Sequence, residues 1–384
     1  MTDARHPLGP HAPELRRSPP WLMEEMIAIE PELGGQICDL PAVAQLAGIL
    51  RTAVDRSEPI AVVGCGTSEH AAMAVAALLR DASPSDSGHG PRIEARQAFE
   101  AALDPWGAGV CLTISHGGAS VATNQALEAA RSAGATTALI TAVERSAATE
   151  LADHVLVTPL EDRSWCHTVG YLSPVIAGGA VAAAMFGRRL SGATVRAFLD
   201  QALTAAGALD RLALGLDGVT HLVIAGSGID LIAARELALK VEEGARLPAV
   251  ARNLETVLHG HLAACDDRTG LVLILTEQHE QARRVQRAAS LLGAARRIGI
   301  RTMGVLGAGP AAELEPQLTS AGRMLLPGST ALSPQLTSLL SSGVALQRLT
   351  LALAHARDLN PDLIRREQPA YREAAAIAES KSRV

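Results

Sequence analysis

The chain has 384 residues, a formal net charge of −6 at pH 7, and 48% hydrophobic but only 2% aromatic residues. This length exceeds what one ordinary hydrophobic core accommodates, so it predicts two domains. We expect no nucleic-acid partner, because the net charge is acidic and the arginines are scattered. The sequence also has no basic stripe, zinc finger or RNA-binding aromatic motif.

The N-terminal 20 residues carry prolines and charges but no apolar run, which predicts a loose arm and not a signal peptide. The sequence has no stretch of about twenty uninterrupted apolar residues, so we expect no membrane partner. The five cysteines are odd in number and form no C-x-x-C pair. This usage is typical of a reduced protein and predicts a cytoplasmic location.

Strand, glycine turn and helix alternate through the first half of the chain. Apolar strands are predicted at 59–63, 109–114, 137–140 and 154–157, with a helix over about 119–133. The alternation predicts a parallel sheet covered by helices on both faces, which is an α/β fold.

The same pattern then starts again. After a helix near 195–208, strands are predicted at 221–225, 270–275, 301–306 and 324–326, with helices ending near 243, over 279–297 and over 334–357. Segment 62–66 matches 223–228, and 110–114 matches 271–275. Such internal repetition predicts two similar doubly wound, flavodoxin-like domains in tandem. We expect an arm at 1–20, a first domain at 21–192, a second at 193–360 and a tail at 361–384.

Two polar turns follow strands of the first predicted sheet, at 64–68 and 115–120. Ligands of open α/β sheets bind beyond the carboxyl ends of the strands, and glycines, hydroxyls and helix N-termini suit a phosphate. The alternative is that these hydroxyl groups cap the following helices. A dinucleotide fingerprint lacks its third glycine and its acidic residue here, and no Gly-Lys-Ser/Thr motif occurs, so no cofactor is expected.

The sequence contains only two lysines, Lys240 and Lys381. Lysine supplies a compact ammonium group that arginine cannot replace in carbonyl chemistry, although biased amino-acid usage explains the scarcity equally well. Lys240 precedes Glu243 by three residues, so a helix would place both side chains on one face. Glu236, four residues before Lys240, leaves open the alternative of an exposed surface pair.

Taken together, these motifs resemble the tandem sugar isomerase (SIS) domain family, which includes the isomerase half of glucosamine-6-phosphate synthase, phosphosugar deaminases and fructosamine deglycases. The family shows C-G-T-S after its first strand, as at 65–68, and S-Q-S-G-E-T after its second, where this chain has 115–120. Its second domain shows A-L-K-x-x-E, as at 238–243, followed sixteen residues later by His-Gly, as at 259–260. A lysine-bearing tail completes the pattern, and the resemblance covers about 40–384.

Moving a carbonyl between two sugar carbons requires a base, and Glu243 is the candidate. The resemblance implies that His259 opens the sugar ring and comes from the partner subunit of a homodimer, so that the active site is shared. Lys240 would stabilise the enolate-like charge, and Lys381, on a tail that closes as a lid, would polarise the carbonyl or form an imine. The expected substrate- and phosphate-binding residues are Cys65, Gly66, Thr67, Ser68, Ser115, His116, Gly117, Ser120 and Cys166.

Several residues depart from the family pattern. Gly117 replaces a hydroxyl residue, Ala119 replaces a glutamate, and His116 replaces a glutamine, where we expect it to compensate as a cation. A later segment, 164–168, is bulkier than the family's V-A-S-T-K. These changes leave fewer polar side chains in the predicted phosphate-binding loop.

The leading hypothesis is a phosphosugar isomerase that acts on a ketose or aldose phosphate, or an amino-sugar phosphate, through an enediol or enamine. Alternatives are a fructosamine-6-phosphate-type deglycase, an amino-sugar phosphate deaminase, and a non-catalytic sugar-phosphate sensor. The sequence shows no glutaminase half, so we expect no ammonia to be drawn from glutamine.

Overall fold

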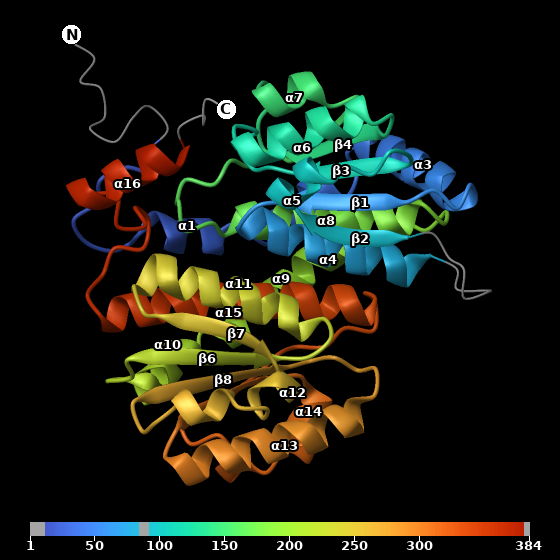
Figure 1. Cartoon of the computed structure of the whole chain (residues 1–384). Coiled ribbons are helices and arrows are strands. Elements are labelled where there is room, and N and C mark those ends of the chain that lie inside the picture. Colours follow the sequence, from blue (N-terminus) through green and yellow to red (C-terminus); the bar gives the residue numbers. More distant parts are fainter. Residues whose placement is uncertain (1–11, 84–91, 380–384) are drawn as a thin grey trace.

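The computed structural model describes residues 12–83 and 92–379, and it contains two five-stranded sheets (Figure 1). The first sheet has the order β2-β1-β3-β4-β5, and all its strand pairs are parallel. Its strands are β1 (Ile60–Gly64), β2 (Ile93–Gln97), β3 (Val110–Ile114), β4 (Thr136–Thr141) and β5 (His154–Val157).

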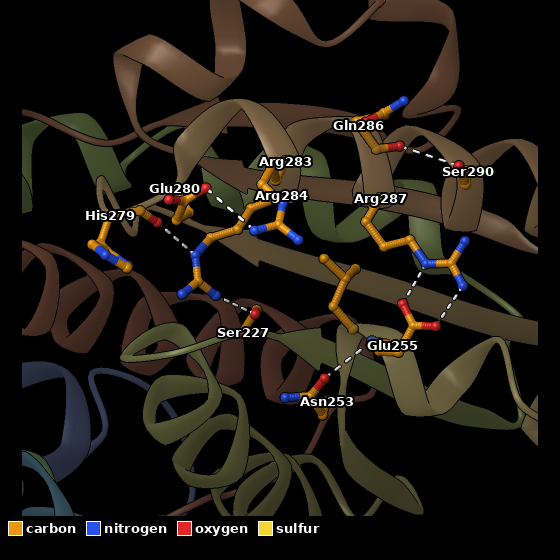
Figure 2. Close-up of a pocket in the computed structure, with 11 residues that line it drawn as sticks. Ser227, Asn253, Glu255, His279, Glu280, Arg283, Arg284, Gln286, Arg287 and Ser290 are labelled. Carbon is orange, nitrogen blue, oxygen red and sulfur yellow. Dashed lines mark hydrogen bonds and ion pairs between the residues drawn. The ribbon is translucent and has the colours of Figure 1, made fainter.

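The second sheet, of order β10-β9-β8-β6-β7, is also fully parallel. Its strands are β6 (His221–Gly226), β7 (Ala249–Asn253), β8 (Thr269–Leu275), β9 (Arg301–Leu306) and β10 (Gly322–Leu325). In both sheets the second strand along the chain lies at one edge beside the first, which is the flavodoxin-like order. The predicted fold class is therefore confirmed. The carboxyl ends of β6 and β7 border the pocket that Figure 2 shows.

Two edge strands, β2 and β7, were not predicted. Their sequences, IEARQ and AVARN, mix polar with apolar residues, and nearly all their side chains are only partly buried. An edge strand of a parallel sheet lacks the continuous apolar run that marks the central strands, so the sequence pattern did not reveal them.

Helices cover both faces of each sheet. In the first half they are α1 (Leu22–Ala28), α2 (Glu32–Ile37), α3 (Pro41–Asp55), α4 (Thr67–Ala82), α5 (Ala98–Leu103), α6 (Val121–Ser132), α7 (Ala147–Leu151) and α8 (Val169–Ala184). In the second half they are α9 (Gly192–Ala206), α10 (Leu209–Leu212), α11 (Asp230–Ala245), α12 (Leu254–Val257), α13 (Gln281–Ile298), α14 (Ala308–Glu313), α15 (Pro334–Ala356) and α16 (Pro369–Glu379). Short 3₁₀ helices lie at Ala213–Leu216, His261–Ala264 and Pro316–Leu318.

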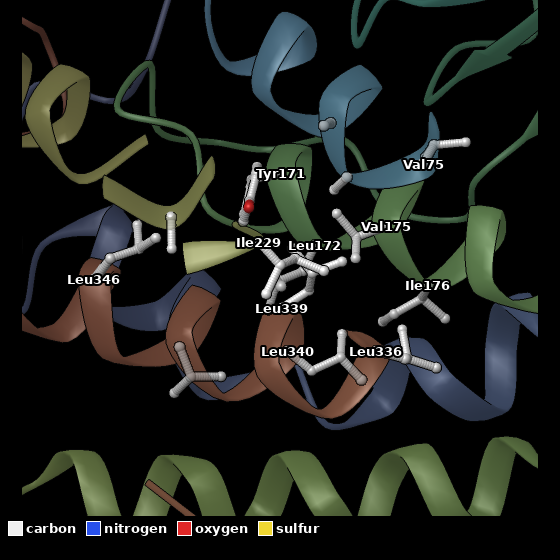
Figure 3. Packing of buried hydrophobic residues seen from close by; sticks show 14 of the residues in the cluster. Val75, Tyr171, Leu172, Val175, Ile176, Ile229, Leu336, Leu339, Leu340 and Leu346 are labelled. Carbon is white, nitrogen blue, oxygen red and sulfur yellow. The ribbon is translucent and has the colours of Figure 1, made fainter. Parts of the chain in front are cut away.

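The two sheets share one core. Helices α4 and α8 of the first half and α11 and α15 of the second lie between the sheets (Figure 1), and a single cluster of buried apolar side chains extends through them. Figure 3 shows Tyr171 and Leu172 of α8 near Leu339 and Leu340 of α15. Because aromatic residues are few, Ala, Leu, Val and Ile fill this layer, as their abundance in the sequence predicts. The interface between the domains is therefore core and not a hinge surface.

Helix α15 is long and apolar enough to cross a membrane, but 94% of its most apolar window is buried inside the protein. Burial on all sides also explains why this helix lacks a polar face, as expected for a helix between two sheets.

Both halves connect their first strand to the next helix by the same turn. A side chain at Gly64 would collide with the backbone of Ser68, and one at Gly226 would collide with that of Asp230. Gly66 and Gly228 follow with φ of 57° and 61°, values that favour glycine. This turn brings α4 and α11, the two helices that carry the predicted active-site residues, close against their sheets.

Candidate functional site

A group of charged side chains is buried between the two domains. Glu236 and Lys240 of α11 are both fully buried, with Lys240 Nζ 3.6 Å from Glu236 Oε1. From the first domain, the Thr67 hydroxyl donates to Glu236 Oε1 at 3.1 Å, and His70 Nδ1 lies 2.6 Å from Glu236 Oε2. The alternative of an exposed Glu236–Lys240 pair is therefore wrong: the pair lies where α11 crosses α4.

Lys240 also contacts the predicted base. Its Nζ lies 2.6 Å from Glu243 Oε2, so the expected placement on one helical face is confirmed. Burial alone would lower the pKa of Lys240, but the carboxylates of Glu243 and Glu236 raise it above its ordinary value. The amine is therefore a fixed cation, suited to stabilise negative charge and not to attack a carbonyl.

Glu243 is the member of this group that reaches solvent, with 23% of its side chain exposed. It borders a pocket of about 290 Å³ whose other lining residues are Glu242, Arg246, Leu247, Pro248, Ile364, Arg365 and Tyr371. The last three belong to the predicted tail, so part of the tail lines the same pocket as Glu243. Lys381 lies outside the described residues.

The segment after β5, which includes Trp165 and Cys166 of the first domain, contacts the residues around this pocket. Cys166 is fully buried, and its thiol donates to the Lys240 carbonyl over 3.8 Å. The Trp165 N–H donates to the Asp362 carbonyl at 2.9 Å, while the Asp362 carboxylate accepts the Leu22 and Met23 N–H groups at the start of α1. The predicted substrate residue Cys166 thus packs against Lys240, and burial raises the pKa of its thiol.

A second pocket, of about 480 Å³, opens at the carboxyl edge of the first sheet. Its lining includes His116 and Gly117 of the predicted phosphate loop, together with Asp162, Trp165 and His167. Asp162 is buried and accepts the N–H groups of Ser164, Thr168 and Gly170. Burial raises its pKa, but His167 above all, with His116 and the Thr168 N–H, outweighs burial and lowers the pKa to about 2. An internal carboxylate therefore takes the N–H groups at the start of α8.

His116 is not the compensating cation that the sequence suggested. Its Nε2 lies 2.8 Å from the Asp162 backbone nitrogen, and a backbone N–H only donates, so Nε2 must be an unprotonated acceptor. Burial, with the neighbouring His167 adding to it, lowers the pKa of His116 to about 4. The imidazole is therefore neutral at pH 7, because protonation would break its bond to Asp162.

The hydroxyl groups of the predicted loops have different environments. Thr67 is engaged by Glu236, Ser115 is buried, and Ser68 is partly exposed. Ser120 is exposed and makes no capping bond to α6, and Gly66 holds the N-cap position of α4, so the capping alternative is not observed for either helix. Cys65 accepts a weak bond from Gln97 at 3.5 Å, and burial raises the pKa of its thiol.

His259 lies away from this group. It follows β7 at the carboxyl edge of the second sheet, whereas Glu243 ends α11 near the start of β7, at the opposite edge. The His259 side chain is 69% exposed, and its Nε2 lies 2.6 Å from Glu255 Oε1. One chain therefore does not bring His259 and Glu243 together.

Sequence reasoning missed three polar residues of the site: Glu236, His70 and Asp162. The spacing of Glu236 and Lys240 was visible, but an i,i+4 pair has the same pattern on a surface and in a core. His70 gave no signal because its partner, Glu236, comes from another helix, and Asp162 gave none because its partners are backbone N–H groups of an irregular segment.

Comparison with known proteins was made for the sequence and for the fold. Residues 55–186 match the family model described as SIS domain. No curated protein sequence matches the chain. The fold is similar to that of tagatose-6-phosphate ketose/aldose isomerase from Escherichia coli, with a TM-score of 0.73, 22% identity, and coverage of 92% of this chain and 98% of that one.

Two further solved structures share the fold at lower identity. The C-terminal domain of glucosamine-fructose-6-phosphate aminotransferase from Francisella tularensis has a TM-score of 0.72 and 16% identity, covering 90% of this chain and 98% of that one. Glucosamine-6-phosphate deaminase from Thermotoga maritima has a TM-score of 0.65 and 16% identity, covering 89% and 96%. All three alignments include both halves of this chain.

Removing the buried ammonium tests the charge group. Lys240→Met keeps a long side chain but leaves Glu236 buried without its cation, so we expect a loss of about 3–5 kcal/mol in unfolding free energy. Adding Glu236→Gln should recover part of that loss, because a neutral amide is cheaper to bury. Urea unfolding of the two variants and the wild type measures both effects; a Lys240→Met protein as stable as wild type would contradict the account.

The neutral His116 predicts a pH dependence. Between pH 6.5 and about 4 the unfolded chain binds a proton at this residue that the folded chain does not, so stability falls as pH decreases through that window. Between pH 7 and 4.5 we expect the free energy of unfolding to fall by roughly 1–3 kcal/mol because of His116. In His116→Gln that part of the decline should disappear, and unfolding curves at several pH values would show it. An unchanged pH profile would refute the assignment.

Proposed function

We propose that this chain is a phosphosugar isomerase-type enzyme, because residues 55–186 match the SIS domain family model and the chain has a fold similar to that of a ketose/aldose isomerase. The proposed reaction moves a carbonyl between C1 and C2 of a ketose, aldose or amino-sugar phosphate through an enediol or enamine. The names of the similar structures, which include a ketose/aldose isomerase and a deaminase, support this class of chemistry.

The observation that carries the proposal is the Lys240–Glu243 contact of 2.6 Å beside a pocket. In the forward direction, the Glu243 carboxylate takes the proton from the carbon next to the carbonyl. The electrons of that C–H bond form the enediolate double bond, and the carbonyl oxygen becomes negative. Glu243 then returns the proton to the former carbonyl carbon, while the hydroxyl proton of the adjacent carbon passes to the former carbonyl oxygen, which leaves the new carbonyl on that adjacent carbon. The buried Lys240 ammonium would stabilise the developing oxyanion in a site of low dielectric.

One observation favours an amino-bearing substrate as the second candidate. The pocket at the first sheet is lined by the acidic residues Glu14, Glu161 and Asp162, and its one arginine, Arg163, is paired with Glu25. With His116 neutral, this lining fits an ammonium group better than a second anion. A fructosamine-6-phosphate-type deglycase or an amino-sugar phosphate deaminase would use the same base.

We also propose a homodimer in which His259 of one subunit completes the site of the other. The support is geometric: within one chain His259 lies at the opposite edge of the second sheet from Glu243, and its imidazole is 69% exposed. The five cysteines are all free, which supports a reducing compartment and the proposed cytoplasmic location.

Exchange with solvent tests the base. A panel of hexose, pentose and amino-sugar phosphates is incubated in deuterated water, and deuterium at C1 or C2 is followed by mass spectrometry. Glu243→Gln should lower the exchange rate by about 10²–10⁴-fold while ligand binding persists. Glu242→Gln is the matched control, because its exposed neighbouring carboxylate accepts only the Ala249 N–H. Equal rates in Glu243→Gln and wild type would reject Glu243; binding without exchange in the wild type would support a sensor instead.

Subunit mixing tests the shared site. Glu243→Gln and His259→Ala homodimers should each be inactive, but a mixed dimer contains one site with both native residues. After subunit exchange we expect about a quarter of wild-type activity, since half the dimers are mixed and each has one working site. Recovery no greater than the sum of the separate proteins would exclude a shared site.

A further inference from the structure

A pocket that does not include Glu243 lies at the carboxyl edge of the second sheet. It has a volume of about 610 Å³ and lies between the end of β6, the end of β7 and helix α13 (Figure 2). This is the position at which open α/β sheets bind ligands, and the volume is typical of a small-molecule site. Neither the predicted site residues nor the proposed reaction uses its lining.

Arginines dominate this lining. Arg283, Arg284 and Arg287 lie on the first turns of α13, with Glu280 at the N-cap of the same helix and Glu255 on α12. Arg287 is paired with Glu255 through two bonds, and Arg283 is 83% exposed and lies 3.6 Å from Glu280. Arg283 and Arg287 therefore each have a carboxylate partner at ion-pair distance.

Arg284 is held in place by neutral groups. Its Nη1 donates to the Ser227 hydroxyl and its Nε donates to the His279 carbonyl at 2.8 Å. Within 12–83 and 92–379, the structure gives this guanidinium no ion pair. The nearby Glu277 carboxylate instead accepts the His279 and Ile229 N–H groups, at 3.0 and 3.4 Å. A partly buried, oriented guanidinium without an ion pair gains more from an incoming anion than one that is already paired.

The turn after β6 keeps the guanidinium accessible. A side chain at Gly228 would lie 3.2 Å from Arg284 Nη2 and 2.8 Å from the Glu277 carboxylate. The glycine leaves that space open. Ser227 and Asn253, at the ends of β6 and β7, and Ser290 of α13 add polar groups around the same space.

We propose that this pocket binds a phosphorylated small molecule, with Arg284 as the residue that recognises the phosphate. The planar guanidinium fork matches phosphate oxygens, and the remaining volume accommodates the organic part of the ligand. This site is separate from the pocket beside Glu243, because the two lie at opposite edges of the second sheet.

Local hydrogen exchange with inorganic phosphate as the probe tests the proposal on the full chain. Sodium chloride at equal ionic strength is the reference, so that general screening is removed. In the wild type, phosphate at about four times its Kd should slow exchange in peptides covering 276–290 by about fivefold. Peptides covering 115–120 and 162–168 report the first-domain pocket independently.

Arg284→Gln should abolish the slowing in 276–290. Arg296→Gln, which removes an equal charge near the far end of α13 and outside the pocket lining, should retain it. Unchanged exchange elsewhere shows that each variant folds. The proposal is overturned by an absence of slowing in the wild type up to 50 mM phosphate, or by equal slowing in Arg284→Gln. The experiment measures phosphate binding at this pocket, so its result does not depend on whether Glu243 catalyses deuterium exchange.

Discussion

The structure depends on keeping an ammonium group and its carboxylates out of water between two domains. Lys240 and Glu236 are both fully buried, and Glu236 is satisfied only because Thr67 and His70 approach from the other domain. Separating the domains would leave this charge group without those partners. A buried ion pair adds little net stability by itself, but losing one partner is costly. The pair therefore specifies one arrangement of the two halves, and that arrangement also places Glu243 at the pocket.

Two copies of one topology carry different chemistry at the same edge. In the first domain the loop after β3 carries a neutral imidazole, His116, beside a buried carboxylate, Asp162, which accepts the backbone N–H groups at the start of α8. In the second domain, Asp230 is buried in the turn after β6 and accepts the Thr276 and Glu277 N–H groups, while burial raises its pKa to about 6. Each domain thus uses an internal carboxylate to fix a loop.

Much of this architecture was predictable because central parallel strands are apolar throughout and the glycine turns recur at matching positions. The same logic failed at β2 and β7, whose partly exposed edge positions allow polar residues. At the site, the spacing of Lys240 and Glu243 fixed their contact, since both lie on one helix. The burial of Glu236 was not predictable, because it depends on α4 crossing α11. Nor was the neutral state of His116, which depends on a backbone N–H from residue 162, supplied by another segment.

The near absence of lysine has a practical consequence. Reagents that acylate or cross-link primary amines need an exposed, deprotonated amine, and Lys240 offers neither while the domains are packed together. Labelling at Lys240 would therefore count only those molecules whose two halves have come apart. The chain therefore carries, within its own sequence, a chemical reporter of domain opening, provided that the label at Lys240 is distinguished from that at Lys381 and the N-terminal amine.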